Sequence, residues 1–394
     1  MPRCPDTSPA ARSLRPSVFA TLAAQFPKLP KPPIPLHLGD TYRQPTDGAR
    51  YEHALAKLPK NAYAYTNPNG MPELRQAAVD RLAREGYPGL TIDHVHVTSG
   101  GTAAINTVLA TWLQPGDEVL VMAPYWPLIK GMCLTLGAVP VEVPFYPAMR
   151  EGKSVAEVVG PYVTEKTVAF YMCSPNNPCG TVLTRAQAEE VAQFCIDRDL
   201  WVLDDQAYQH YVYDGEQTFL GSLPGMAQRT ATAMTVSKSY ALAGVRVGFL
   251  VGDPAWLDPA RRVATHSVYN IPLPCQLSAL GAIETADPWI AETKGLYMQA
   301  ADLMAKRLQA KFYPAQGGGY VFADLTEELG DKSVVDWIGE LLYEGVCVSP
   351  GDAFGADFSK HVRICYTSAP LDQIALAIDI LNANFERMRK RLAA

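Results

Sequence analysis

Lys238 lies in a segment whose residue types suit a buried, reactive amine. Residues 235–248 read TVSKSYALAGVRVG, so small hydroxyl and apolar side chains flank the lysine. Burial in such surroundings lowers the pKa of a lysine and makes its amine a nucleophile that can form a Schiff base. Arg246 follows eight residues later and is suited to bind a phosphate through two hydrogen bonds. Because serine-lysine pairs are common, this segment alone leaves a purely structural role open.

A second segment, residues 98–104, has the composition of an anion-binding turn. It reads TSGGTAA and joins an expected strand at 94–98 to an expected helix at 102–113. Gly100 and Gly101 would let the backbone approach an anion closely, and the N–H groups at the start of the helix would face it. The alternative is an ordinary tight turn, because the segment lacks the glycine pattern of a dinucleotide site and the lysine of a nucleotide-phosphate loop.

Two further loops follow expected interior strands at 167–172 and 200–204. Residues 174–181 read SPNNPCGT, where an asparagine amide can donate to an oxyanion, although such a loop is also typical of a plain turn. The other loop begins with Asp204 and Asp205. A carboxylate on an apolar strand is costly to bury unless a cation lies near it, and a solvated loop acid is the alternative. Both loops follow the carboxyl ends of their strands, and open α/β sheets bind their ligands at that edge.

Arg363 completes the set of candidate residues. Residues 361–366 read HVRICY, which places the arginine in a short apolar strand near the C-terminus. Its guanidinium could bind a substrate carboxylate through two parallel hydrogen bonds. A surface arginine on an edge strand is the commoner situation, so this residue gains its meaning only from the others.

Strands and helices alternate along the segment that carries most of these residues. Pro72 and Gly86 bracket a helix, and Thr184 is the expected N-cap of an amphipathic helix at 185–197. The other expected elements are strands at 94–98, 118–122, 139–143, 167–172 and 200–204 and helices at 102–113 and 128–136. This alternation predicts an α/β fold with a mostly parallel sheet that helices cover on both faces.

The two ends of the chain have a different texture. Residues 27–35, PKLPKPPIP, are expected to form an extended linker after an N-terminal helix at about 13–25. The C-terminal part is expected to contain a long helix from Pro288 to about Phe312, a strand after Gly317-Gly318-Gly319, a helix at 334–343, strands near Val346 and Val362 and a helix from Pro370. We expect a large domain at 46–286 and a small α+β domain at 287–394, on which residues 1–45 pack.

The composition argues against nucleic-acid, membrane and metal partners. The 394 residues carry a formal net charge of −6 without any long block of like charge, and 48% of them are hydrophobic, which suits a large core. The polar, proline-rich N-terminus has no apolar signal region, and no apolar stretch approaches the length of a membrane span. The eight cysteines show no zinc-type spacing, so we expect free thiols and a cytoplasmic location.

The order of these motifs closely resembles that of the class I/II aminotransferases of fold type I. The motifs are the glycine loop, N-N-P-x-G-T, D-x-A-Y, S-K-x7-R-x-G and V-R-I, and the resemblance runs from about Leu36 to the C-terminus. It implies a mostly parallel, seven-stranded sheet sandwiched by helices, with a smaller α+β domain. It also implies pyridoxal 5'-phosphate as cofactor, small-molecule amino and 2-oxo acids as substrates, and a homodimer with shared active sites.

The resemblance gives each motif a role. Lys238 matches the lysine that binds the cofactor covalently, and Asp205, three before Tyr208, matches the partner of the pyridine nitrogen, with Asp204 the less favoured choice. Lys238, Asp205 and Tyr208 are therefore the expected catalytic residues. Asn177 and Tyr208 match the pair that hydrogen-bonds the phenolic oxygen.

Further positions follow from the same motifs. The expected phosphate-binding residues are Gly100, Gly101, Thr102, Thr235 and Arg246, with Ser237 as a further contact; Trp126 is expected to stack on the ring, and Tyr65 to reach the phosphate of the neighbouring subunit. Gly39, Asn177 and Arg363 match the substrate-carboxylate site. Gly101 and Thr235 differ from the commonest family residues but keep the backbone or hydroxyl donor. The Asn177–Pro178 peptide is expected to be cis.

The implied reaction is the transfer of an amino group to 2-oxoglutarate or pyruvate. Thr265 stands five residues before Asn270, about where aspartate-specific relatives carry an arginine, so we expect a neutral or aromatic donor. Tyr42, Trp126 and residues 267–269 could form the donor's wall, although Arg43, Arg262 or His266 could restore acid recognition. The alternatives are a lyase, decarboxylase, cyclase or synthase on the same site, a non-catalytic cofactor-binding regulator and a nucleotide-binding α/β protein.

Overall fold

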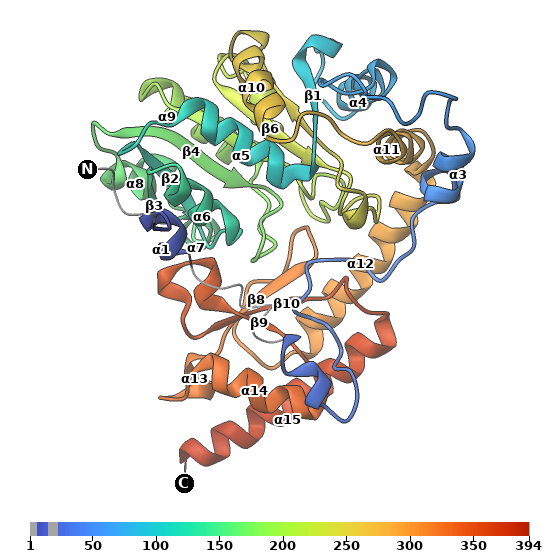
Figure 1. Ribbon diagram of the computed structural model, residues 1–394. Coiled ribbons are helices and arrows are strands. Elements are labelled where there is room, and N and C mark those ends of the chain that lie inside the picture. Colours follow the sequence, from blue (N-terminus) through green and yellow to red (C-terminus); the bar gives the residue numbers. More distant parts are fainter. Residues whose placement is uncertain (1–5, 15–22, 394) are drawn as a thin grey trace.

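A seven-stranded sheet is the centre of the larger part of the molecule (Figure 1). The structure is a computed structural model that describes residues 6–14 and 23–393. The strand order is β1-β7-β6-β5-β4-β2-β3, and only β7 runs antiparallel to its neighbours, which confirms the predicted mostly parallel sheet. Its strands are β1 (Val95–Thr98), β2 (Glu118–Ala123), β3 (Val139–Pro144), β4 (Thr167–Cys173), β5 (Trp201–Asp205), β6 (Thr230–Thr235) and β7 (Gly248–Val251).

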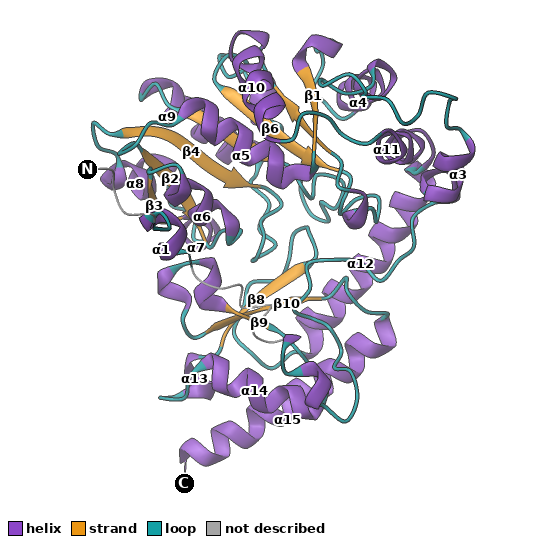
Figure 2. Cartoon of the chain, in the orientation of Figure 1, coloured by secondary structure: helices purple, strands orange, loops and turns teal. Residues whose placement is uncertain are grey.

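Helices follow most of the strands and cover both faces of the sheet (Figure 2). They are α1 (Pro9–Ser13), α3 (Tyr51–Ala56), α4 (Pro72–Arg84), α5 (Gly100–Trp112), α6 (Leu128–Thr135), α7 (Phe145–Arg150), α8 (Val155–Val159), α9 (Arg185–Asp197), α10 (Pro254–Ser267), α11 (Leu273–Thr285), α12 (Asp287–Arg307), α13 (Thr326–Leu329), α14 (Val334–Glu344) and α15 (Leu371–Ala393). Thr184 caps α9 as predicted, because its side chain accepts a hydrogen bond from the Gln187 N–H. Within the described residues, none of these helices is long and apolar enough to cross a membrane.

Successive residues of the strands enter two different cores. Val119 and Val121 of β2 share one core with Val108 of α5, whereas Leu120 and Met122 share a second core with residues of α7, α8 and α9. Side chains alternate between the faces of a strand, so a strand that is apolar throughout must be covered on both sides. This is why the near-continuous apolar runs in the sequence form interior strands.

A second, three-stranded antiparallel sheet lies opposite the carboxyl ends of the large sheet (Figure 1). It consists of β8 (Tyr320–Asp324), β10 (His361–Cys365) and β9 (Ser349–Pro350), in that order. Helices α12, α14 and α15 pack beside it, where the rings of Trp337 and Phe385 stack 5.9 Å apart. Figure 1 shows α12 running from the region of the large sheet to that of the small one.

Helix α12 ends earlier than predicted. The apolar pattern indicated a helix to about Phe312, but the helix stops at Arg307 and Leu308 is extended. Lys311 then forms an antiparallel bridge with Asp324, and the N–H of Gln309 donates to the Asn382 side chain. Pairing with distant residues therefore outweighs the local helical pattern.

The segment before α3 reaches the small sheet. Ile34 forms a parallel bridge with Val346, and the Leu36 carbonyl accepts a 2.8 Å hydrogen bond from the Cys365 N–H. The predicted N-terminal helix at about 13–25 falls mainly on residues 15–22, which lie outside the described residues. Before them the structure has the short helix α1.

Candidate active site

The candidate residues gather at the carboxyl edge of the large sheet. Because β7 is antiparallel to both β1 and β6, the strands β1, β6, β5 and β4 all point the same way. The glycine loop follows β1, Asn177 follows β4, Asp205 ends β5 and Lys238 follows β6. The topology thus brings four separate sequence segments to one edge, which faces the small sheet (Figure 1).

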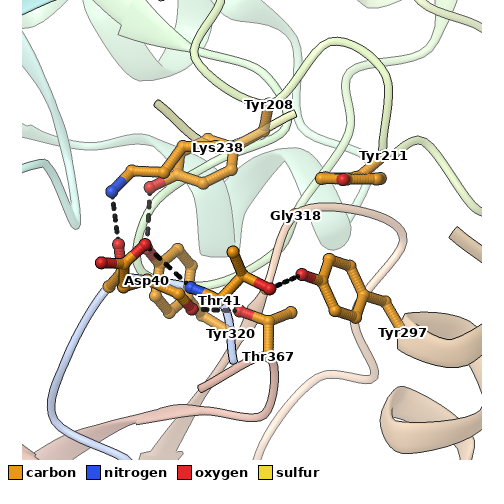
Figure 3. Close-up of a pocket in the computed structure, with 11 residues that line it drawn as sticks. Asp40, Thr41, Tyr208, Tyr211, Lys238, Tyr297, Gly318, Tyr320 and Thr367 are labelled. Atoms are coloured by element: carbon orange, nitrogen blue, oxygen red, sulfur yellow. Dashed lines mark hydrogen bonds between the residues drawn. The ribbon is translucent and has the colours of Figure 1, made fainter. Parts of the chain in front are cut away.

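Lys238 borders a pocket between the two sheets (Figure 3). The pocket is lined by Gly39, Asp40, Thr41, Tyr208, Tyr211, Lys238, Tyr297, Gly318, Gly319, Tyr320 and Thr367. The lysine amine donates a hydrogen bond to the Gly39 carbonyl. Burial lowers the pKa of Lys238, and the nearby carboxylate of Asp40 opposes this change. The amine is therefore closer to its neutral, nucleophilic form than a surface lysine is.

Arg246 stands over the first turn of α5. A Cβ on Gly100 would collide with the Arg246 guanidinium, and Gly100 has a φ of +77°, a conformation that favours glycine. Arg246 itself has a φ of +57°, and its guanidinium donates to the Ala243 carbonyl at 2.9 Å and to Ser237 Oγ at 3.5 Å. None of the salt bridges among the described residues involves Arg246. The guanidinium is thus available to an anion.

Backbone and hydroxyl donors lie around this guanidinium. Gly101 and Thr102 belong to the first turn of α5, whose N–H groups have no acceptor within the helix. Thr235 Oγ1 lies 2.8 Å from Ser237 Oγ at the end of β6. A cation, a helix N-terminus and two hydroxyl groups together make a set of donors that fits a phosphate.

The two adjacent aspartates of β5 have different surroundings, since successive side chains point to opposite faces. Asp204 Oδ1 accepts from the Gln206 amide at 2.7 Å, and its Oδ2 accepts from the Leu220 N–H at 3.0 Å, so protein groups satisfy both oxygens. Asp205 accepts from Tyr171 Oη at 2.9 Å and lies near enough to Lys238 to feel its charge. Asp205 is therefore the aspartate whose charge interacts with that of Lys238, although Asp205 does not itself line the pocket.

Burial makes ionised Asp205 expensive without a cation. It raises the pKa of Asp205 to about 6, although the hydrogen bonds from Tyr171 and from the Ala207 N–H act in the opposite direction. A protonated ring nitrogen placed against this carboxylate would lower its pKa again and favour the ionised form.

Asn177, Tyr208 and Arg363 form one hydrogen-bonded chain. The Asn177 amide donates to Tyr208 Oη at 3.4 Å, and Arg363 donates to Asn177 Oδ1 at 3.1 Å. Arg363 is buried, and it also donates to the His37 carbonyl at 2.7 Å. These hydrogen bonds connect the loop after β4 with β10 of the small sheet. Gly39 lies at the same place, because a Cβ there would approach Arg363 to 3.7 Å.

Trp126 and Tyr65 lie outside the pocket. Trp126 is half-buried before α6 and packs against the core that contains α5. Tyr65 is 84% exposed and contacts Tyr269, with ring centroids 5.1 Å apart. Tyr42 and residues 267–269 do not line this pocket either, and neither do the predicted site residues Asn177, Asp205, Arg246 and Arg363.

Sequence reasoning predicted only Gly39, Tyr208 and Lys238 among the residues that line the pocket, and Tyr320 and Asp40 are the most important of those it missed. Tyr320 is fully buried and its hydroxyl lies 2.7 Å from that of Tyr208. Asp40 borders the pocket beside Lys238 (Figure 3). Tyr320 directly follows Gly317-Gly318-Gly319, and that glycine run was the only signal of its special position. The Asn177–Pro178 peptide is cis as predicted, and two further peptides that were not predicted, Ala123–Pro124 and Ser174–Pro175, are also cis.

The arrangement fits pyridoxal 5'-phosphate. Its aldehyde needs a nucleophilic amine, its phosphate an anion site, its ring nitrogen a carboxylate and its phenolic oxygen a donor. One sheet edge supplies all four groups. The amine is that of Lys238, the anion site surrounds Arg246, the carboxylate is that of Asp205 and the donor is Tyr208. No group of histidine, cysteine, aspartate and glutamate side chains in the described parts of the chain could hold a metal ion.

Comparison with known proteins gives a consistent family. The family model for aminotransferases of class I and II matches residues 37–381. An aromatic-amino-acid aminotransferase of Thermococcus litoralis is 33% identical, with 81% of this chain and 83% of that protein covered. An arginine–pyruvate transaminase of Pseudomonas aeruginosa is also 33% identical, with 76% and 77% covered. An aspartate aminotransferase of Pyrococcus abyssi is 32% identical, with 81% and 83% covered.

Solved structures agree in fold. A mutant aspartate aminotransferase of Thermus thermophilus superposes with a TM-score of 0.88 at 26% identity, with 97% of this chain and all of that chain covered. An aromatic aminotransferase of Pyrococcus horikoshii superposes with a TM-score of 0.84 at 27% identity, with 92% and 97% covered.

Proposed function

The chain belongs to the class I and II aminotransferase family, and on that premise we propose that Lys238 binds pyridoxal 5'-phosphate with Asp205 and Arg246 as its main anchors. The protein is a pyridoxal-phosphate-dependent aminotransferase acting on an amino acid and a 2-oxo acid. The bound cofactor supplies an electron sink for negative charge on the substrate's Cα. The observation that carries the assignment is the Lys238 amine, partly buried at the carboxyl edge of the sheet.

The proposed roles of the other residues follow from this assignment. The Lys238 amine would take the proton from the substrate's Cα as general base and, as the resulting acid, deliver it to C4′ of the cofactor. Ionised Asp205 holds the ring nitrogen protonated, and Tyr208 and Asn177 donate to the phenolic oxygen. Arg246, Gly100, Gly101, Thr102, Thr235 and Ser237 hold the phosphate, Trp126 covers the ring, and Arg363 with Gly39 and Asn177 binds the substrate's α-carboxylate.

We propose a neutral or aromatic amino acid as the donor. Thr265 has no charge, and its hydroxyl is engaged with the Arg261 carbonyl at 2.7 Å. Asp40 places a carboxylate at the pocket, where it would repel the second carboxylate of an aspartate donor. Tyr208, Tyr211 and Tyr320 offer aromatic edges and faces to an apolar side chain. The name of the Thermococcus litoralis relative is consistent with this donor.

A cationic donor is the second candidate, and Asp40 is the observation that favours it. A guanidinium or ammonium side chain could form a charge-assisted hydrogen bond with this exposed carboxylate. The relative from Pseudomonas aeruginosa is named for arginine as its donor. Asp40 would then attract the side chain of the donor instead of only repelling acids.

A panel of donors separates these proposals. We would compare kcat/KM for phenylalanine, leucine, alanine, arginine and aspartate, with pyruvate and 2-oxoglutarate as acceptors. A preference for phenylalanine or leucine supports the first donor, and a preference for arginine that Asp40→Asn removes supports the second. A hundredfold preference for aspartate, about 2.7 kcal/mol of discrimination, would reject both. No amino transfer with any donor would reject the function itself.

We further propose a homodimer whose active sites are shared. Two groups of large apolar or aromatic side chains are exposed, and the contact between Tyr65 and Tyr269 joins them. The six residues are Tyr51, Leu55, Tyr63, Tyr65, Val268 and Tyr269. A soluble chain rarely leaves so many exposed unless a partner covers them. Tyr65 would contact the phosphate of the neighbouring subunit. Sedimentation velocity tests this proposal, and an active monomer would reject it.

The compartment and the domain division are also proposals. All cysteines among the described residues are free thiols, Cys133, Cys173, Cys179, Cys195, Cys275, Cys347 and Cys365, which favours the reducing cytoplasm. We place the large domain at 46–286 and the small domain, with the N-terminal segment 1–45, at 287–394. Limited proteolysis with mass mapping would test whether cleavage occurs near residue 287.

A further inference from the structure

Tyr320 contacts both ends of the proposed site. Its hydroxyl lies 2.7 Å from Tyr208 Oη, and the ring face lies 4.6 Å from the guanidinium carbon of Arg363. The side chain is 1% exposed and stands at the start of β8 (Figure 3). Asn177 likewise forms hydrogen bonds with both Tyr208 and Arg363.

We propose that Tyr320 is a positioning residue that directs the Tyr208 hydroxyl toward the cofactor and holds the Arg363 guanidinium for the substrate carboxylate. This inference rests on the proposed function. It assigns to one side chain of the small sheet a task at the cofactor and a task at the substrate carboxylate.

The number of available protons determines which tyrosine donates in the hydrogen bond between Tyr208 and Tyr320. A phenol has one proton to donate, and its oxygen can accept. Burial raises the pKa of both Tyr208 and Tyr320, so both remain protonated at neutral pH. If Tyr208 gives its proton to the cofactor's phenolic oxygen, it cannot also donate to Tyr320. Tyr320 must therefore donate to Tyr208, which polarises the Tyr208 O–H bond and makes it a stronger donor.

The ring of Tyr320 fixes the plane of Arg363. The guanidinium carbon of Arg363 lies 4.6 Å from the ring centroid of Tyr320 and 5.0 Å from that of Phe354. Arginine stacks favourably on aromatic faces, and the stacked plane sets the direction of its paired N–H groups. Arg363 would therefore meet a carboxylate without first losing rotational freedom.

Gly39 leaves the space that this arrangement needs. A Cβ on Gly39 would lie 2.6 Å from Tyr320 Oη, which is closer than real Cβ atoms come to such an oxygen. The carbonyl of the same glycine accepts from Lys238. Tyr320 thus pairs its hydroxyl with that of Tyr208, carries the Arg363 cation over its ring and occupies the space that a Gly39 side chain would need.

Two substitutions separate the hydroxyl from the ring. Tyr320→Phe keeps the ring, so we expect the KM of the best donor to stay within about twofold. The pKa read from the visible absorbance of the lysine-bound cofactor should rise by about 0.5 unit, because a weaker Tyr208 donor stabilises the anionic oxygen less. Tyr320→Leu removes both the hydroxyl and the aromatic ring. Because Arg363 then loses the ring on which it stacks, the KM of the donor should also rise about tenfold.

Tyr366→Phe is the matched control. Tyr366 is equally buried, and its hydroxyl donates to the Gly318 carbonyl at 3.3 Å instead of to Tyr208. This variant should shift neither the spectroscopic pKa nor the KM. The absorbance titration needs no turnover, so it separates this inference from the proposed function. An unshifted pKa in Tyr320→Phe, or an unchanged KM in a folded Tyr320→Leu, would overturn the corresponding task of Tyr320, whereas a wild-type protein without amino transfer would instead reject the function.

Discussion

Replacing Asp205 by asparagine should make the cofactor-free protein more stable and the enzyme nearly inactive. The carboxylate is buried, and its neighbours among protein groups are neutral donors, Tyr171 and the Ala207 N–H. The charge of Lys238 reduces the cost of the carboxylate's charge, but without the cofactor no cation among the described residues forms an ion pair with it. An amide of the same shape has no such cost, but it cannot keep a ring nitrogen protonated.

The pKa of Asp205 gives the size and the sign of the stability change. Burial raises this pKa from 3.8 to about 6, which corresponds to about 3 kcal/mol at 1.36 kcal/mol per unit. Between these two values the folded state binds more protons than the unfolded state, so stability falls as the pH rises through the window. Asp205→Asn should therefore raise the free energy of unfolding by up to about 3 kcal/mol at pH 8 and by about 1 kcal/mol at pH 4.5.

The effect on activity has the opposite sign. Removing one partner of a buried charge pair costs about 3–5 kcal/mol, so kcat should fall by about a hundred- to several-thousandfold. Asp204→Asn is the control, because both Asp204 oxygens are satisfied by Gln206 and Leu220 and do not serve the pocket. That variant should lose far less activity than Asp205→Asn.

Urea unfolding of cofactor-free protein at pH 4.5 and pH 8, followed with intrinsic fluorescence, measures the first effect. Amino-transfer assays with saturating cofactor measure the second. An Asp205→Asn protein that is destabilised at pH 8, or whose stability gain does not depend on pH, would refute the reasoning about burial. An inactive Asp204→Asn beside an active Asp205→Asn would show that the ring partner is the other aspartate.

The remaining predictions concern the lysine, the subunit interface and the phosphate site. Lys238→Ala should fold, bind the cofactor only noncovalently and not turn over; borohydride reduction and peptide mapping of the wild type would contradict this by finding cofactor on another lysine. Mixed dimers of Lys238→Ala and Tyr65→Ala subunits should regain about a quarter of the wild-type activity, because half of the dimers carry one complete site; no recovery argues against sharing. Gly100→Ala should weaken cofactor binding at least about tenfold, since the methyl group displaces Arg246. Gly116→Ala, with a φ of +94° in open space, is its control for backbone strain, and equal loss in both would contradict the phosphate assignment.

The motifs and the interior strands could be predicted because their signals are local. The spacing from Lys238 to Arg246 and the apolar runs of β2, β4 and β5 lie within short windows of sequence. The placement of β7 between β1 and β6, antiparallel to both, has no such signal, because neighbours in a sheet are chosen by the whole fold. The predicted end of α12 was wrong for the same reason, because Lys311, beyond the end of the helix at Arg307, pairs with the distant Asp324.

The pocket shows the same limit at the level of single residues. Asp205 could be preferred over Asp204 through the family motif, and the structure supplies the physical reason in the two hydrogen bonds that Asp204 already accepts. Tyr320 could not be found, because a tyrosine at the start of a strand is ordinary until its distance to Tyr208 is known. Asp40 lies far from Lys238 in sequence, and only the fold brings them together.

The extended segment at 34–40 also affects the order in which the molecule can assemble on the ribosome. The His37 carbonyl accepts its hydrogen bond from Arg363, which is synthesised 326 positions later. The Asp40 carbonyl accepts from Thr367, 327 positions later. At about 5–20 residues per second, this interval lasts about 16–65 s. The strands between residues 95 and 251 can pair during that time, but the pocket cannot close. The nascent chain therefore exposes this segment, and the unfinished cofactor site, until synthesis is almost complete.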